Sequence, residues 1–114
     1  MGPDGRPERA GPDGRVDRVF TALSDPTRRA VVRLLADGPA TATELSERLP
    51  VSRQAVAKHL SALDEAGLVA SSREGREVRY RLTPAPMAEA ASWMAEVGAE
   101  WDRRLQALRR HLSR

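Results

Sequence analysis

Between residues 51 and 68, apolar residues recur at the three- and four-residue spacing of a helix that buries one side. That side consists of three aliphatic residues, Val56, Leu60 and Leu63. Ser52 is suited to cap the first turn, because a serine hydroxyl accepts a hydrogen bond from a free backbone N–H group. Gly67 stands where a residue in the left-handed conformation commonly ends a helix. The pattern predicts an amphipathic helix between these two residues.

Three shorter helices are predicted before this one. Residues 16–23 and residues 26–36 have helical spacing of apolar positions. Thr41 and Glu44 form a capping box that opens a third helix, because each side chain can satisfy a free backbone N–H group there. Pro50 ends the third helix by disfavouring helical geometry at the preceding residue. A short connection then leads to the amphipathic helix, and the two helices form a helix-turn-helix.

After the glycine the spacing of apolar residues changes from helical to alternating. Residues 68–73 and 77–82 are predicted to be strands around a turn at residues 74–76. Alternation directs the side chains of Val78, Tyr80 and Leu82 inward and those of Arg79 and Arg81 toward water. A helix-turn-helix followed by a hairpin is a winged helix. The predicted fold class is mainly α with one β-hairpin: four helices, the hairpin and a final helix.

The final predicted helix, which reaches about Leu112, carries apolar or small residues at alternating steps of four and three. They are Met87, Ala91, Met94, Gly98, Trp101, Leu105, Leu108 and Leu112. This is a heptad pattern, and a small domain has little core left to cover so long a stripe. We expect the stripe, together with Val19 on the first helix, to form a homodimer interface. Capping of a single chain's core is the alternative for part of it.

These patterns divide one small domain into three segments. Residues 1–15 are rich in glycine, proline and charge and contain the sequence GPDGR twice, so we expect a disordered tail. Residues 16–82 form the winged helix-turn-helix core. Residues 83–114 form the dimerisation helix, which completes the same domain.

The polar side of the amphipathic helix has the chemistry of a DNA reader. It presents six residues, Ser52, Arg53, Gln54, Ala57, Lys58 and Ser61, with no carboxylate before Asp64. Arginine and lysine can donate to guanine O6 and N7, and glutamine can pair with adenine N6 and N7. We interpret these six residues as base-reading. An ordinary solvated helix surface is the alternative.

Six further residues are candidates for contacts with the DNA backbone: Thr41, Thr43, His59, Arg73, Arg76 and Arg79. The arginines belong to the predicted wing, beside the reading helix, where they would meet phosphates or a minor groove. For Arg79 the alternative is a charge that protects a strand edge from aggregation. For His59 the alternative is packing within the helix-turn-helix.

Composition narrows the function. The 114 residues carry 19 Lys and Arg against 16 Asp and Glu, and residues 51–82 contribute 6 − 4 = +2 of the net charge of +3. The positive surplus is therefore concentrated in the predicted DNA-binding part. The absence of cysteine excludes disulfides and thiolate metal ligands. We recognise no signal peptide, membrane span, nucleophile with a base, or phosphate-binding loop, and we expect a cytoplasmic protein that is not an enzyme.

Three runs of sequence carry a resemblance to a known family: ALSDPTRRAVVRLLADG, ATELSERLPVSRQAVAKHLSALDEAGLV and SSREGREVRYRL. Together they resemble the bacterial ArsR/SmtB-type winged-helix repressors, densely over residues 16–82 and loosely over the last helix. The resemblance implies a homodimer that pairs through its first and last helices. It also implies binding to an inverted repeat near a promoter, often with repression of the protein's own operon.

The chain departs from the metal-sensing members of this family. Those members have cysteines in the third helix, and the matching ATELSERLPVS has none. Others bind zinc on the last helix, where this chain offers Asp102 and His111 without a second histidine and at different helical phase. We therefore expect a repressor that needs no metal or other cofactor. A small-molecule or protein effector stays open.

A winged-helix module that binds another protein is the alternative function. Such a surface usually carries aromatic anchors. The aromatic residues, Phe20, Tyr80, Trp93 and Trp101, all lie off the predicted reading surface. Trp93 lies outside the heptad stripe and is a candidate for a separate partner or ligand surface.

Overall fold

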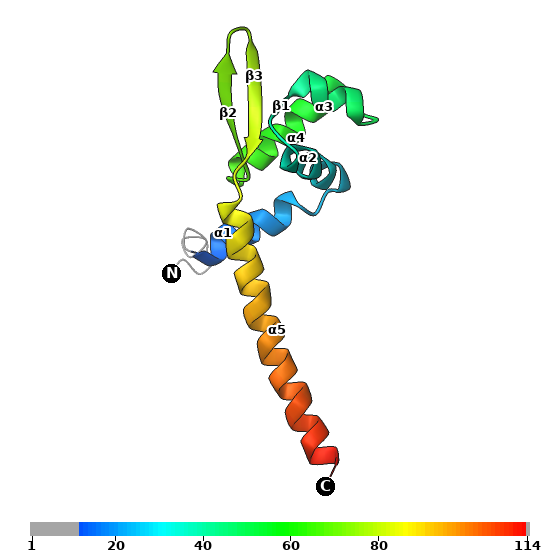
Figure 1. The fold of residues 1–114 in the computed structure, drawn as a ribbon, viewed down its shortest axis with the longest axis vertical. Helices are drawn as coiled ribbons and strands as arrows, with labels where there is room; N and C mark the ends of the chain where they lie inside the picture. Colours follow the sequence, from blue (N-terminus) through cyan, green and yellow to red (C-terminus); the bar gives the residue numbers. More distant parts are fainter. Residues whose placement is uncertain (1–11, 114) are drawn as a thin grey trace, which may run out of the picture.

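The computed structural model describes residues 12–113, and the fold is a winged helix-turn-helix with a long C-terminal helix (Figure 1). The elements in chain order are α1 (Pro12–Ala22), α2 (Pro26–Ala36), β1 (Ala40–Thr41), α3 (Ala42–Arg48), α4 (Arg53–Glu65), β2 (Val69–Glu74), β3 (Glu77–Leu82) and α5 (Ala85–Leu112). The predicted fold class is confirmed, with the addition of one short strand. None of the described helices is long and apolar enough to cross a membrane.

The first helix begins earlier than predicted. It starts at Pro12, so residues 12–15 are helical and the prediction that they belong to a disordered tail is wrong. Proline is favourable at the first helical position, because its missing N–H group would have no partner there. Arg15 adds an ion pair with Glu89 of α5, at 3.2 Å between Nε and Oε1. Residues 1–11 of the predicted tail lie outside the described residues.

Side-chain caps begin α2, α3 and α4, and those of α3 and α4 lie where the sequence predicts them. The Asp25 carboxylate accepts hydrogen bonds from the backbone N–H groups of Thr27 and Arg28, at 2.8 and 3.0 Å. The hydrogen bond from Arg28 is the main reason that the pKa of Asp25 lies below its ordinary value. The capping box at the start of α3 has both of its hydrogen bonds. These caps fix where each helix of the DNA-binding core begins.

The core is centred on α4. The three aliphatic residues predicted to be its buried side are all fully buried, as is Leu68 after the helix. Gly67 has a φ of +78°, the left-handed conformation that the C-terminal position requires. Val19 of α1 is 1% exposed and belongs to the same cluster. The expectation that Val19 lies in a dimer interface is therefore wrong, because the chain's own core already covers it.

The three strands form one antiparallel sheet in the order β1-β3-β2. β1 pairs with β3 only at Ala40–Tyr80 and Thr41–Arg79, and a two-residue strand leaves no alternating pattern to recognise in the sequence. β2 and β3 form the hairpin, which we call the wing, with Gly75 and Arg76 at its turn. Gly75 has a φ of +65°, as tight hairpin turns demand.

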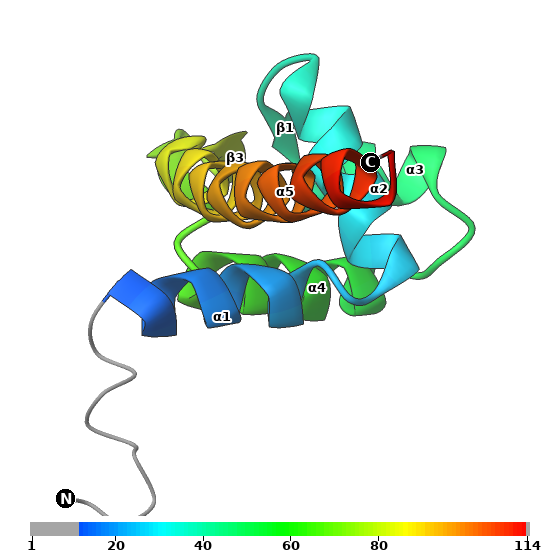
Figure 2. The ribbon, with the colours of Figure 1, turned by 90° about the horizontal axis from the view of Figure 1, so that it is seen from below.

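α5 crosses α1 near its own N-terminus and then runs away from the rest of the molecule. Figure 1 shows that its C-terminal half projects on the side opposite the wing, and Figure 2 shows α1 lying beside α4. Ala90 is buried at the crossing, whereas residues 91–104 are all exposed. Most of the long helix therefore has no partner among residues 12–113.

Candidate nucleic-acid interface

A tight turn sets α4 against α3. Leu49 ends α3 in an extended conformation, with φ −126° and ψ 147°, as expected before Pro50. The Ser52 hydroxyl then accepts a hydrogen bond from the N–H group of Ala55 at 3.1 Å and begins α4. The two helices and this turn leave the N-terminal half of α4 open on one side.

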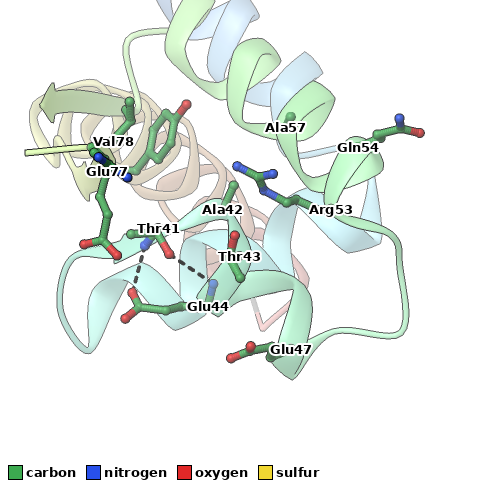
Figure 3. Close-up of a pocket in the computed structure, with 12 residues that line it drawn as sticks. Thr41, Ala42, Thr43, Glu44, Glu47, Arg53, Gln54, Ala57, Glu77 and Val78 are labelled. Atoms are coloured by element: carbon green, nitrogen blue, oxygen red, sulfur yellow. Dashed lines mark hydrogen bonds between the residues drawn. The ribbon is translucent and has the colours of Figure 1, made fainter.

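The six predicted base-reading residues share that open side, which we call the recognition face: Ser52, Arg53, Gln54, Ala57, Lys58 and Ser61. All six are exposed, and the buried stripe of α4 lies on the other side of the helix. In Figure 3, Arg53 extends over the space between α4 and α3, whereas Gln54 points away from it. The recognition face therefore divides into an outward part and a part that borders a groove.

That groove, about 520 Å³ in volume, lies between the recognition face, the start of α3 and the wing. Thr43 and Arg76 line it and are exposed, as their predicted contacts with the DNA backbone require. Thr41 also lines it but is only 8% exposed. Its hydroxyl accepts from the Glu44 N–H group at 3.1 Å, and its own N–H group donates to the Glu44 carboxylate at 2.9 Å. Thr41 therefore holds α3, and its expected contact with a phosphate is not supported.

Arg79 was predicted to face water, but its side chain is directed toward carboxylates of the same chain. Its side chain is 27% exposed, and it forms ion pairs with three carboxylates, at 3.3 Å to Glu44, 3.3 Å to Glu74 and 3.2 Å to Glu77. These carboxylates raise the pKa of Arg79, against an opposing effect of burial, so the guanidinium stays charged. Arg73 and Arg76 have no ion-pair partner within residues 12–113 and are exposed. The wing therefore offers Arg73 and Arg76 to a phosphate, and not Arg79.

Comparisons with known proteins agree with this geometry. A helix-turn-helix domain family matches residues 23–72. The transcriptional repressor SdpR of Bacillus subtilis is 33% identical over 79 residues, which are 69% of this chain and 88% of SdpR. The arsenical resistance operon repressor of Escherichia coli is 34% identical over 98 residues, 85% of this chain and 84% of that repressor. The chain belongs to the ArsR family.

A solved structure supports the same assignment. An ArsR-like transcriptional regulator from Rhodococcus sp. RHA1 superposes with a TM-score of 0.76 at 47% identity, over 85% of this chain and 92% of that chain. This ArsR-family chain is a DNA-binding transcriptional regulator of the repressor type and not an enzyme.

His59 of this ArsR-family chain faces the interior more than the DNA side. It is half-buried, and its Nδ1 atom is buried without a hydrogen-bond partner among the described residues. It lies near Asp25 at the start of α2. The structure therefore favours packing between α4 and α2 over a phosphate contact for His59.

The heptad stripe of α5 is largely exposed. Met94, Trp101 and Leu108 are 51%, 58% and 52% exposed, and Leu105 is half-buried. Near the N-terminus of α5, Ala90 packs on the core, whereas its neighbour Ala91 is exposed and stays a predicted interface residue. Met87 also packs against the core, so this end caps the single chain as the alternative stated. A Cβ atom built on Gly98 would meet nothing within 4 Å.

Three features were missed from the sequence. Val97, at 46% exposure, lies one heptad after Ala90 and belongs to the apolar stripe. Phe20 of α1 is exposed and contacts Trp93 of α5 edge to face, with ring centroids 5.8 Å apart. The contact between Arg79 and Glu44 joins residues 35 positions apart, and only the pairing of β1 with β3 could have predicted it.

Proposed function

We propose that this protein is a homodimeric, sequence-specific repressor that acts on its own or a neighbouring promoter without a metal ion. The observation that carries the proposal is the recognition face, whose six residues are all exposed beside two wing arginines that have no ion-pair partner among residues 12–113. The arsenical resistance operon repressor and SdpR, to which the chain is similar, are both named as repressors. The protein-interaction alternative gains no support, because the large exposed aromatic residues of the described chain lie on α1 and α5.

Base reading is assigned to the recognition face and phosphate contacts to its neighbours. Gln54 and Lys58 lie one helical turn apart, so both can enter one major groove and contact neighbouring base pairs. Thr43 and Arg76 border the groove beside them and are suited to hold phosphates. Arg73, nearer the base of the wing than Arg76, would add a further charge contact.

The second copy is assigned to the apolar stripe of α5. Seven large hydrophobic side chains of the described residues are exposed, and all lie on α1 or α5: Phe20, Trp93, Met94, Val97, Trp101, Leu108 and Leu112. Contiguous apolar surface of this kind marks an interface in soluble proteins. A twofold dimer would present two recognition faces about one DNA turn apart, ~34 Å, and would therefore select an inverted repeat.

A mobility-shift titration tests the assignment. We expect the protein to bind DNA from upstream of its own gene more tightly than a scrambled duplex at physiological salt. Gln54→Ala should lose about 1–3 kcal/mol at particular base pairs. Arg76→Ala should weaken all sequences alike and reduce the salt slope by about one per protomer. Arg110→Ala removes the same charge from the distant end of α5 and serves as the control. Equal affinity for upstream and scrambled DNA would contradict the proposal.

We propose that the repressor needs no metal because the chain has few side chains that bind transition metals. The sequence has no cysteine, and its two histidines, His59 and His111, lie on α4 and α5. We expect Zn²⁺, Cd²⁺ and Ni²⁺ to leave both the melting temperature and the DNA affinity unchanged. Metal-dependent release of operator DNA would contradict this part of the proposal. A parallel screen of small metabolites would test for another effector.

A further inference from the structure

The carboxylate oxygen that caps α3 also binds the wing. Glu44 Oε1 accepts a hydrogen bond from the N–H group of Thr41 at 2.9 Å and another from Arg79 Nη1 at 3.3 Å. The first of these fixes the start of α3, the first helix of the helix-turn-helix. The second reaches β3 of the wing. One side chain therefore connects the two parts of the proposed DNA-binding surface.

Within the wing, the same guanidinium lies between two like charges. Glu74 and Glu77 are directly opposite each other at the end of the hairpin, an arrangement that repels. Arg79 Nε lies 3.3 Å from Glu74 Oε1, and Arg79 Nη2 lies 3.2 Å from Glu77 Oε1. All three nitrogens of the guanidinium thus face carboxylates, and it is not presented to a phosphate.

Arg79 lies at the point where the wing loses its third strand. β1 covers β3 only at Tyr80 and Arg79, and from Arg79 to the turn the wing has two strands and no third. An isolated two-stranded hairpin is marginally stable, so its direction depends on what holds it at the base. Residues 71–77 are all exposed, so among the described residues little packs against the wing beyond that base.

We propose that Arg79 is a positioning residue that locks the wing to α3, so that Arg76 and the recognition face meet DNA at one fixed spacing. This inference rests on the proposed function, since it concerns the same DNA surface. A fixed spacing favours the specific complex, in which α4 and the wing must contact DNA together. It contributes little to non-specific binding, which depends mainly on charge.

Two substitutions and one control test the lock. Arg79→Gln removes the guanidinium. Glu44→Gln keeps the capping box, because glutamine serves as well as glutamate at that position, but it removes the charge that Arg79 binds. Arg81→Gln is the matched control: Arg81 lies two residues along the same strand, is exposed, and has no ion-pair partner in residues 12–113.

Whether Glu44→Gln weakens or tightens DNA binding distinguishes a positioning role of Arg79 from a phosphate contact. We expect Arg79→Gln and Glu44→Gln each to weaken specific binding about tenfold, and the double variant to be no worse than either, because both remove one coupling. Non-specific affinity and the salt slope should change no more than in Arg81→Gln. If Arg79 instead contacted a phosphate, Arg79→Gln would lower the salt slope, and Glu44→Gln would tighten binding by removing a negative charge near DNA. That pair of results would overturn the inference.

A measurement without DNA separates failure of the lock from failure of the proposed function. Hydrogen exchange of the backbone amides in β1 and in residues 77–80 should become faster in both Gln variants and stay unchanged in Arg81→Gln. Unchanged exchange in all three variants would overturn the lock, whatever the DNA results. A second outcome combines faster exchange in the Gln variants with equal affinity of the wild type for upstream and scrambled DNA. It would support the contact between Arg79 and Glu44 but remove its proposed role in recognition. That outcome would also overturn the inference.

Discussion

Truncation of Trp101 tests whether the apolar stripe of α5 joins two copies of the chain. The side chain is 58% exposed in the single chain. A tryptophan covers roughly 150–250 Å² when buried, so roughly 90–150 Å² of Trp101 would be removed from water by a partner helix. At about 25 cal/mol per Å², burial of that area contributes ~2–4 kcal/mol per side chain.

Each chain contributes one copy of this residue, so Trp101→Ala should weaken a twofold dimer by at least about 4 kcal/mol, a rise of about a thousandfold in the dissociation constant. Sedimentation velocity over a range of protein concentrations measures this constant directly. Circular dichroism would check that the variant retains the helical content of the wild type. Loss of the dimer with a retained fold is the expected result.

Gln106→Ala provides the matched control for Trp101→Ala. Gln106 is exposed and lies on the opposite side of α5, five residues farther along the helix, so its truncation should leave the dissociation constant unchanged. A Trp101→Ala protein that dimerises as tightly as the wild type would refute the assignment of the stripe. So would a wild type that remains monomeric at all concentrations tested.

Three further predictions concern the stability of the DNA-binding core, and urea unfolding measures each. Gly67→Ala should cost about 1–2 kcal/mol because of its φ of +78°, and not because of crowding, since the nearest atom to the added Cβ is Pro86 Cγ at 3.6 Å. Ser52→Ala should cost about 1 kcal/mol, because the hydrogen bond that caps α4 is lost, and Ser52→Asp should retain that stability. Asp25 has a lowered pKa, so its carboxylate stabilises the fold above the unfolded-state pKa of about 4, and this contribution is lost as the pH falls through the folded-state value. Asp25→Asn, which keeps a capping side chain, should show a shallower loss of stability in acid than the wild type; equal pH dependence would contradict the role of the charge.

Local signals in the sequence predicted the DNA-binding core well. The caps at Asp25, Thr41 and Ser52 each depend on one side chain and the backbone within three residues, so they are readable without tertiary information. The buried side of α4 was predicted correctly because it repeats over several turns. The exposure of the recognition face then follows, since it is the opposite side of the same helix.

The wrong predictions share a dependence on contacts between distant segments. The strand pattern directed Arg79 toward water, but alternation cannot tell solvent from a neighbouring helix that bears a carboxylate. Val19 was expected at an interface, and the packing of α1 buried it instead.

Because the chain has a modest net charge, we expect DNA binding to depend on the proposed dimerisation. The recognition face and wing tip of one protomer offer four exposed cations, Arg53, Lys58, Arg73 and Arg76, against a net charge of only +3 for the whole chain. Each phosphate contact adds only a modest share of DNA affinity, so a single copy would bind weakly at physiological salt. In the proposed dimer, pairing through α5 would make the second DNA contact intramolecular and would raise affinity without any new residue at the DNA. The proposed α5 interface would therefore compensate for the small number of cations on the proposed DNA-binding surface.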